Sequence, residues 1–468
     1  MRSGFQRCFL LMSLICAASV PLAAQKRIIR HEDVFLMKRV GEPIISPDGK
    51  LAVFSLTEPD YDPAKQTVDL WLVPVDGSAP ARRLTSTRGA ESSPTFSPDS
   101  TRLAFSARRE GDEAPQIYIL PLNGGEALRV TSSPKGASAP RWRPDGKSIL
   151  FESMVPPAPQ AAPKHSARVY ETFPIRIWNA WLENAKPHIF VQELTEGATA
   201  HDVLAETRLA SSKGFDGIAS GLGADRALHA IWTPDGAGIV FAAAVNADET
   251  MYAEVESHLF RVSAVGGEPE RLTKSGNSYS RPRYSPGAAQ LFAQYRRSPS
   301  QGRIYSLTRL ARLDPAGAMT DVADRWDRSV ANYAFSPDGR TIYVEAEDEG
   351  FDKLFRMPSS GGTVELLLPV KEGGYNNPLP VPGGLIARFG SSVQPPQIVR
   401  IDPVSGAHRL LTNFDADRVA SLDWRQAEHF WFTAKNGKRI HNLITYPPRF
   451  EPSKKYPLVV FPHGEEEG

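Results

Sequence analysis

Short apolar stretches recur along most of the chain, and each follows a turn built on Ser-Pro-Asp-Gly or a close variant. The full turn stands at residues 46–49 and again at 336–339. The prolines of the six turns are Pro47, Pro98, Pro144, Pro234, Pro286 and Pro337. Four of the five intervals between them span 46 to 52 residues, and the fifth, from Pro144 to Pro234, spans 90. A nearly fixed period of this length indicates a repeat architecture.

The residues after each turn predict a small antiparallel sheet. Apolar stretches follow the turns at 51–54, 103–105, 149–151, 239–241 and 342–344. A second stretch runs into a Gly-rich turn, as at 70–72, and a third ends on a threonine such as Thr85 or Thr195. Proline presets φ, aspartate caps the turn and glycine accepts a positive φ, so the turn joins neighbouring strands. With the strand that enters the turn, each unit has four strands.

A four-stranded sheet of this size cannot bury its two faces alone, and radial stacking of such sheets buries both. A seventh, degenerate unit is expected between Asn377 and Thr412. We therefore predict an all-β fold, with a seven-bladed β-propeller of four-stranded antiparallel blades over residues 41–417. Residues 25–40 are expected to form an N-terminal lead-in. An open β-solenoid is the main alternative, although its repeats are usually shorter.

The long interval predicts an insertion at about 154–187 within one blade. Residues 156–163 are rich in Pro and Ala, which suits no strand interior. Strand-forming residues resume at 188–191 and reach Thr195, where we expect the blade to end, and 196–229 is expected to be a second loop. Three residues of the insertion are candidate substrate-binding residues, because exposed aromatic and arginine side chains anchor ligands: Arg176, Trp178 and Trp181. Packing of the two tryptophans onto the rim is the alternative.

The first 24 residues predict a secretory signal peptide. Arg2 and Arg7 give a positive start, an apolar run follows at 8–20, and Ala24 is the small residue that a signal peptidase needs. The run is too short for a confident membrane span. We expect cleavage after Ala24, a secreted or periplasmic protein and no membrane association afterwards; a retained anchor is the alternative.

Composition and charge exclude several classes of function. The chain has 54 Lys+Arg and 53 Asp+Glu, so it offers no single-sign field for nucleic acid or an anionic membrane. Both cysteines, Cys8 and Cys16, lie in the predicted signal, which excludes disulfides and thiol chemistry from the mature chain. The sequence contains no H-E-x-x-H and no G-x-x-x-x-G-K-[ST] motif. No metal, no cofactor and no nucleic-acid partner is predicted.

The residues after the repeats follow a different pattern. Residues 430–432 predict a strand, Asn436 and Gly437 a hairpin turn, and 440–446 the returning strand. The continuous apolar run at 457–461 is typical of a strand buried on both faces, as in the sheet of an α/β domain.

Together, the repeats, the turn and strand at Gly437-Lys438-Arg439-Ile440 and the stretch at 456–464 resemble the prolyl oligopeptidase family of serine peptidases. The similar branch is that of acylaminoacyl and dipeptidyl peptidases. Residues 32–40 are similar to the family's lead-in, as a short helix, and 176–178 resembles its blade insertion. The resemblance implies a propeller that caps an α/β-hydrolase domain, admits short peptides and excludes folded proteins. It also implies that His463 and Gly464 are a remnant of the oxyanion region.

The chain departs from the family at the catalytic centre. A Ser-His-Asp triad needs a serine on a G-x-S-x-G elbow. The nearest matches, at 136–140 and 276–280, lack the closing glycine and are expected to be loops. After Gly464, where the family has Gly-Gly-Pro, three glutamates follow, and their charge would oppose an oxyanion.

We therefore assign no catalytic residue and interpret 418–468 as the truncated start of a hydrolase domain. The chain is expected to be the substrate-gating part of a secreted peptidase for short peptides, inactive alone. A TolB-like periplasmic propeller that binds proteins or peptides is the alternative, although such a module has no need for the apolar strand at 457–461.

Overall fold

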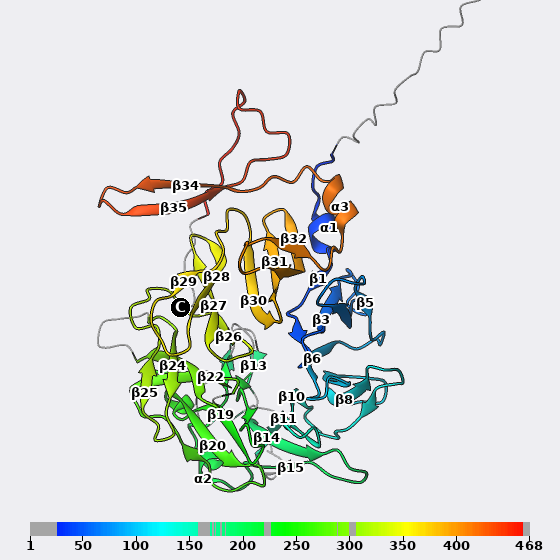
Figure 1. The fold of residues 1–468 in the computed structure, drawn as a ribbon, viewed down its shortest axis with the longest axis vertical. Helices are drawn as coiled ribbons and strands as arrows, with labels where there is room; N and C mark the ends of the chain where they lie inside the picture. Colours follow the sequence, from blue (N-terminus) through cyan, green and yellow to red (C-terminus); the bar gives the residue numbers. More distant parts are fainter. Residues whose placement is uncertain are drawn as a thin grey trace, which may run out of the picture.

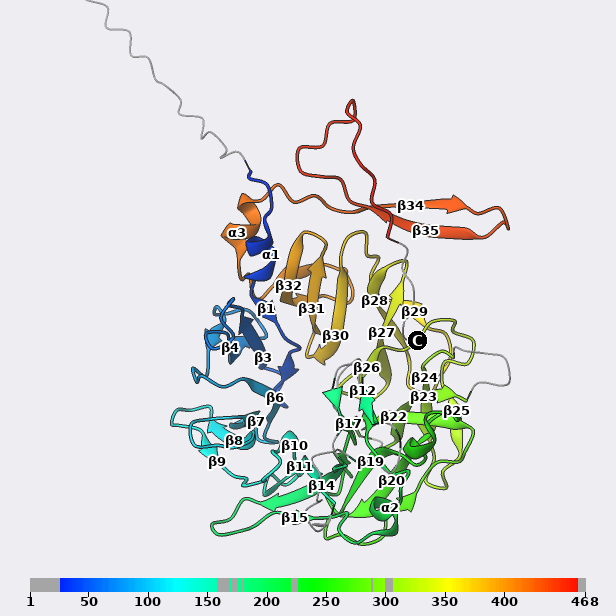
Figure 2. The ribbon, with the colours of Figure 1, turned by 180° about the vertical axis from the view of Figure 1, so that it is seen from behind.

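Seven antiparallel blades form a ring in the part of the chain that the structure describes, which confirms the predicted seven-bladed propeller (Figures 1 and 2). Six blades have four strands, and the inner strand position of the first blade is divided between two short strands. The computed structural model describes residues 26–157, 169–170, 173, 175–177, 180–182, 184–219, 226–287, 289–298 and 306–461. The predicted signal peptide lies outside these residues. Among the described residues, no helix is both long and apolar enough to cross a bilayer.

The first three blades follow the chain from β1 to β15. Blade 1 contains β1 (Arg39–Val40), β2 (Ile44–Ile45), β3 (Leu51–Glu58), β4 (Thr67–Pro74) and β5 (Arg82–Arg83). Blade 2 contains β6 (Glu91–Phe96), β7 (Arg102–Ala107), β8 (Gln116–Pro121) and β9 (Leu128–Arg129). Blade 3 contains β10 (Ser138–Trp142), β11 (Ser148–Val155), β14 (Lys186–Glu193) and β15 (His201–Asp202).

Four blades complete the ring. Blade 4 contains β18 (Ile231–Trp232), β19 (Gly238–Ala244), β20 (Ser257–Ser263) and β21 (Glu270–Arg271). Blade 5 contains β22 (Asn277–Tyr284), β23 (Leu291–Arg297), β24 (Arg309–Leu313) and β25 (Met319–Asp321). Blade 6 contains β26 (Asn332–Phe335), β27 (Thr341–Asp348), β28 (Phe351–Pro358) and β29 (Glu365–Leu366). Blade 7 contains β30 (Gly374–Val381), β31 (Gly384–Ser391), β32 (Gln394–Ile401) and β33 (His408–Leu410).

The remaining elements decorate the ring. They are the helices α1 (His31–Phe35), α2 (Arg208–Ser211) and α3 (Ala416–Ser421), the 3-10 helix η1 (Ala247–Glu249), and the two-stranded pairs β12 (Arg176–Ile177) with β13 (Ala180–Trp181), β16 (Ile218–Ala219) with β17 (Arg226–Ala227), and β34 (Glu428–Thr433) with β35 (Arg439–Ile444). The predicted hairpin around Asn436 and Gly437 is therefore present.

The Ser-Pro-Asp-Gly turn has the chemistry expected of it. The Ser46 hydroxyl donates to the Asp48 carboxylate at 2.6 Å and accepts the Leu51 N–H at 2.9 Å. Gly49 has φ +72°, which glycine adopts without a steric penalty. The turn at 336–339 repeats the same bonds. Each turn thus fixes the register of the first two strands of its blade.

The threonines that follow the outer strands tie those strands to the third strand of the same blade. The Thr85 hydroxyl accepts the Leu70 N–H at 2.9 Å, and Thr131, Thr273 and Thr412 bind in the same way. Thr195 does not, so the prediction that blade 3 ends there is wrong. The outer strand β15 comes later, and there the Val203 N–H bonds to the Ile189 carbonyl at 3.0 Å.

Apolar side chains between neighbouring blades form the core. Seven buried clusters occupy the seven junctions of the described ring. The cluster between blades 7 and 1 contains Phe54, Ile386 and Ile398, which are all fully buried. All strands of blade 7 come from 374–410, so side-chain packing, and no shared strand, joins the first blade to the last.

A clasp outside the ring holds the two ends of the propeller together. The Arg27 N–H donates to the Ser421 carbonyl at 2.9 Å, and the Asp423 N–H donates to the Arg27 carbonyl at 2.8 Å. The Lys38 N–H reaches Asp415 at 2.7 Å. Helix α1 is shorter than predicted, because residues 39–40 already pair with 56–57 as an inner strand of blade 1. The lead-in therefore braces the junction of blades 7 and 1.

The ion pair of Asp33 with Arg27 makes this clasp sensitive to acid. Hydrogen bonds from Arg27 lower the pKa of Asp33 to about 2, against a smaller opposing effect of burial. The stabilisation is thus present above the ordinary carboxyl pKa and is lost as the pH falls from about 4 towards 2. We expect Asp33→Asn to lower the melting temperature at pH 6, with a difference from the parent chain that shrinks below pH 4. The exposed control Asp324→Asn should show no such pH dependence in calorimetry.

The two ends of the blades carry different structures. In every blade the turn from the first to the second strand and the turn from the third to the fourth lie at one end. The loops from the second to the third strand, and the crossings to the next blade, lie at the other end. Helix α1 packs on this second face, where Phe35 stacks on Tyr61 with ring centroids 4.6 Å apart. We call it the loop face.

Candidate functional site

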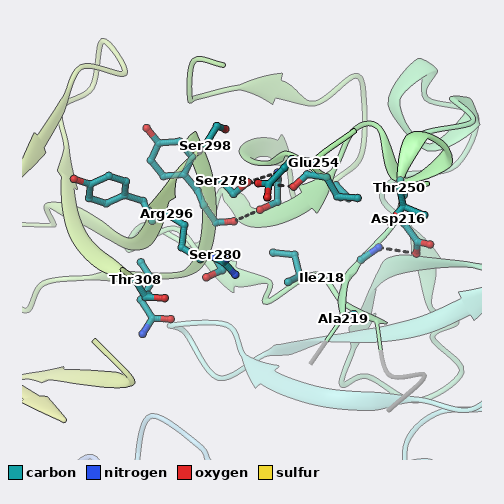
Figure 3. Close-up of a pocket in the computed structure, with 18 of the residues that line it drawn as sticks. Asp216, Ile218, Ala219, Thr250, Glu254, Ser278, Ser280, Arg296, Ser298 and Thr308 are labelled. Carbon is teal, nitrogen blue, oxygen red and sulfur yellow. Dashed lines mark hydrogen bonds between the residues drawn. The ribbon is translucent and has the colours of Figure 1, made fainter. Parts of the chain in front are cut away.

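A large pocket lined by described residues opens on the loop face over blades 4 and 5. Its volume is about 1270 Å³. Its walls come from the crossing between blades 3 and 4, the 247–255 loop, the ends of β22 and β23, and Arg176 of the blade-3 insertion (Figure 3). The pocket is thus formed mainly by loops and crossings, which differ from blade to blade, at the ends of the repeated strands.

An irregular inner strand positions the side chains at the pocket floor. The register of β22 with β23 shifts between Ser280 and Arg283, and Arg281 between them has φ +46°. His229, just before β18, has φ +49°. A bulge with a left-handed residue turns the side chain away from the regular alternation of the strand. Both residues line the pocket as a result.

Buried polar groups fix the base of the site. Gln294 donates to the carbonyls of Val330 and Ala331 at 2.9 and 3.1 Å. Tyr295 donates to Asp321 at 2.7 Å, and burial together with this bond raises its pKa to about 12. Arg226 pairs with Asp216 at 2.6 Å and donates to the Ala185 carbonyl at 2.8 Å. These bonds hold the side chains of Gln294, Tyr295 and Arg226 in place, and we call the three residues the frame of the pocket.

His229 is uncharged at neutral pH. Burial lowers its pKa to about 4, with further contributions from Arg281 and Arg141. Its Nδ1 atom is buried and has no hydrogen-bond partner among the described residues. This histidine therefore places an uncharged imidazole in the wall of the pocket.

The structure places the sequence-predicted site residues as follows. Arg176 lies on β12 and pairs in register with Trp181 on β13, its guanidinium 5.8 Å from the Trp181 ring. Trp181 is 53% exposed. Arg176 lines the pocket, which brings the blade-3 insertion to the site. Trp178, His463 and Gly464 lie outside the described residues.

The two near matches to a nucleophile elbow lie on strands, so their prediction as loops is wrong. Ser138 starts β10, and its hydroxyl donates to the Glu152 carbonyl at 3.4 Å. Ser278 lies on β22, and its hydroxyl donates to the Val255 carbonyl at 3.3 Å. A catalytic serine needs a base in contact with its hydroxyl, and both hydroxyls bond to backbone.

The hairpin β34–β35 is anchored on the same loop face. His429 packs on Phe351 of blade 6 with ring centroids 4.4 Å apart, and the Ala427 N–H donates to Ser392 of blade 7 at 3.1 Å. His429 Nδ1 lies 2.9 Å from His441 Nε2, and burial lowers the His429 pKa, with a smaller contribution from His441. The hairpin thus leaves the ring at blades 6 and 7, on the side where the pocket opens.

Sequence reasoning missed most of the pocket. Arg281, Arg296 and Thr250 were not singled out, because the two arginines lie on separate strands of blade 5, Thr250 lies in a loop of blade 4, and no local motif links them. The polar residues of the inner strand 277–284 gave no distinct signal, because inner strands of other blades, such as 91–96, also carry polar residues.

Known proteins are similar to this chain in sequence and in fold. Residues 65–171 match the model of the Tricorn protease N-terminal beta propeller domain. Dipeptidyl-peptidase 5 of Porphyromonas gingivalis is 24% identical over 466 residues, which cover 97% of this chain and 66% of that protein. The chain thus spans about two thirds of the length of this curated relative.

Solved structures agree on the fold. Acylaminoacyl peptidase of Pyrococcus horikoshii superposes with a TM-score of 0.64 and 16% identity, over 88% of this chain and 58% of that one. The propeller domain of the Trilobed protease of Pyrococcus furiosus, described as having an open velcro topology, gives 0.55 and 13% identity, over 81% of this chain and 99% of that one. That open velcro topology agrees with the junction of blades 7 and 1 in this chain, where no strand is shared between the two blades. Sequence and fold together relate the chain to the propeller of prolyl oligopeptidase-family peptidases, which confirms the resemblance predicted from its repeats and from residues 436–464.

Proposed function

We propose that this chain is the substrate-admitting propeller of a secreted or periplasmic serine peptidase that acts on short peptides, and that the 468 residues alone do not hydrolyse them. The relatives with matching sequences are named as peptidases. The printed sequence holds no G-x-S-x-G elbow, and the serines nearest to that pattern bond to backbone carbonyls.

The pocket supports the peptide part of the proposal. Its 1270 Å³ exceeds the 300–1,000 Å³ or so of a usual small-molecule site, so it has room for several residues of an extended peptide. Its walls carry hydroxyls and arginines as well as Ile218 and Met251. Such a mixture suits a ligand with a polar backbone and variable side chains.

The observation that carries the proposal is the exposed apolar run after the hairpin. Leu458, Val459, Val460 and Phe461 are 76%, 87%, 75% and 88% exposed. Phe430, Trp431 and Phe432 of β34 are each more than 40% exposed as well. Contiguous exposed apolar residues mark a surface that another structure covers. We propose that an α/β-hydrolase domain covers them and that 457–461 is one of its core strands.

An activity assay tests the proposal. The purified chain and a longer product, extended by the sequence encoded after codon 468, would be compared on aminoacyl and dipeptidyl chromogenic substrates. We expect turnover by the longer product and none by the 468-residue chain. Turnover by the chain alone would contradict the proposal, and turnover by neither would favour a TolB-like binding propeller.

A substitution within the apolar run distinguishes an exposed segment, as in the 468-residue chain, from the core strand that we propose for the longer product. Val459→Asp should change the stability of the 468-residue chain by less than about 0.5 kcal/mol, because the side chain is already in water. In the longer product the same change should place a charge in a core and abolish folding or activity. Val404→Asp, at a residue 95% exposed in a turn of blade 7, is the matched control and should be neutral in both. Equal tolerance of Val459→Asp in both products would refute the core-strand assignment.

A further inference from the structure

The pocket over blades 4 and 5 has an excess of positive charge. Among its described lining residues there are five arginines and two carboxylates. The five arginines are Arg176, Arg226, Arg281, Arg296 and Arg297. Of the carboxylates, Asp216 is already paired with Arg226 at 2.6 Å, and the other is Glu254. Outside that ion pair, four arginines and one carboxylate line the pocket, so positive charge is in excess.

Two of these arginines are available to a ligand. Arg296 is exposed and forms no ion pair or side-chain hydrogen bond among the described residues. Arg281 is also exposed, and its one side-chain bond is to the Ala331 carbonyl at 3.0 Å, so its charge has no anionic partner there. By contrast, Arg297 lies 3.9 Å from the carboxylate of Asp321, and Arg226 already forms an ion pair with Asp216. A guanidinium holds a carboxylate through two parallel hydrogen bonds.

Hydroxyl groups lie around Arg296 (Figure 3). Ser278, Ser280, Ser298 and Thr308 lie around Arg296 on one side of the pocket, while Asp216 and Thr250 lie on the other (Figure 3). The Ser298 hydroxyl is buried and has no partner among the described residues. Serine and threonine hydroxyls donate to anionic oxygens without adding charge. The Ser278 hydroxyl donates to the Val255 carbonyl, so Ser298 is the hydroxyl of this group that is shown to have an unused donor.

A second observation reports the same positive environment. His229 lines this pocket, and Arg281 and Arg141 both disfavour a positive charge on its ring. The neutral ring therefore leaves the arginines as the positive charges that a ligand meets.

Building on the proposed function, we infer that this pocket is a subsite for a carboxylate of the peptide, held by Arg281 and Arg296 with help from the surrounding hydroxyls. The carboxylate comes from either the free C-terminus or an acidic side chain, since both have the same chemistry. The subsite would favour short peptides, whose C-terminus reaches the pocket, over internal segments of long chains. No catalytic role is assigned to either arginine.

Isothermal titration calorimetry on the 468-residue chain tests the inference. The first pair of probes is acetyl-Ala-Ala-Ala-Phe as the free acid and as the C-terminal amide, which differ in the carboxylate alone. The second pair is acetyl-Ala-Glu-Ala-Phe amide and its Gln counterpart, which place the carboxylate on a side chain. The acetyl group removes the N-terminal charge from all four peptides.

We expect the preferred acid to bind about tenfold more tightly than its neutral counterpart, the usual value of a charged hydrogen bond. Arg296→Gln and Arg281→Gln should each reduce this preference severalfold, and Arg296→Lys should restore part of it. The control Arg82→Gln, an exposed arginine on β5 across the ring, should keep the full preference. Thermal melts of each variant check the fold, and we expect unchanged melting temperatures because both pocket arginines are exposed.

The outcomes separate the inference from the proposed function. Equal binding of acid and neutral peptides within both pairs, or no binding of any, would overturn the carboxylate subsite. Loss of the preference in Arg82→Gln to the same degree would overturn it as well, because a diffuse field would then explain the binding. Turnover by the longer product would leave the peptidase proposal intact in each of these cases.

Discussion

Replacing Glu152 by alanine should lower the free energy of unfolding by about 2–4 kcal/mol. Glu152 is 7% exposed on β11 of blade 3. Its two carboxylate oxygens accept the backbone N–H groups of Leu228 at 2.8 Å and Ala230 at 3.1 Å, at the start of blade 4. The alanine would leave both donors buried without a partner and would also free the residues that shape His229 for the pocket.

Chemical denaturation of the purified chain measures this loss. Glu126→Ala, at an exposed glutamate in a turn of blade 2, is the matched control and should change stability by less than about 0.5 kcal/mol. Because burial raises the pKa of Glu152, the cost of its charge is absent at low pH and grows as the pH rises through that pKa. The destabilisation by Glu152→Ala should therefore be larger at pH 5 than at pH 8. A loss no greater than that of the control would show that the junction does not depend on this carboxylate.

Replacing Phe241 by alanine should cost about 3–5 kcal/mol, the usual cost of a large cavity in a core. Phe241 is fully buried on β19 in the cluster between blades 3 and 4, and its ring stacks on Phe260 with centroids 5.6 Å apart. The space cannot collapse easily, because Leu150 and Ile189 approach from a different sheet.

Denaturant titration of Phe241→Ala and of the control Leu128→Ala measures the difference. Leu128 is 68% exposed on the outer strand β9, so its truncation should be nearly neutral. Similar losses for both variants would contradict the assignment of stability to the junctions between blades. Activity of the longer product should fall with Phe241→Ala through loss of folded protein, with KM unchanged.

Much of the fold could be predicted from local chemistry. The Ser-Pro-Asp-Gly turns specify their own register through bonds within five residues, such as Ser46 with Leu51, so the repeat could be recognised along the chain. The outer strand of blade 3 could not be predicted in this way. No threonine like Thr85 marks β15, which is held to β14 by backbone pairing alone. The predicted length of helix α1 was too great, because residues 39–40 pair with β3 as a strand.

The candidate site was only partly predictable. Arg176 and Trp181 stood out because they are close in sequence, and they do face each other across β12 and β13. Arg281 and Arg296 line one pocket with the crossing at 216–219 only after the ring forms. The left-handed backbone of Arg281 depends on a bulge that no sequence motif predicted. Contacts of this kind follow from tertiary packing and not from the periodicity of the strands.

Labelling with a fluorophosphonate, which reacts with activated serines, tests the central claim most directly. The chain and the longer product would be treated alike, digested and mapped by mass spectrometry. The account predicts no labelled serine within residues 26–461 and one labelled serine, beyond residue 468, in the longer product. A label on any propeller serine, including Ser138 or Ser278, would show that the propeller supplies its own nucleophile and would contradict the account.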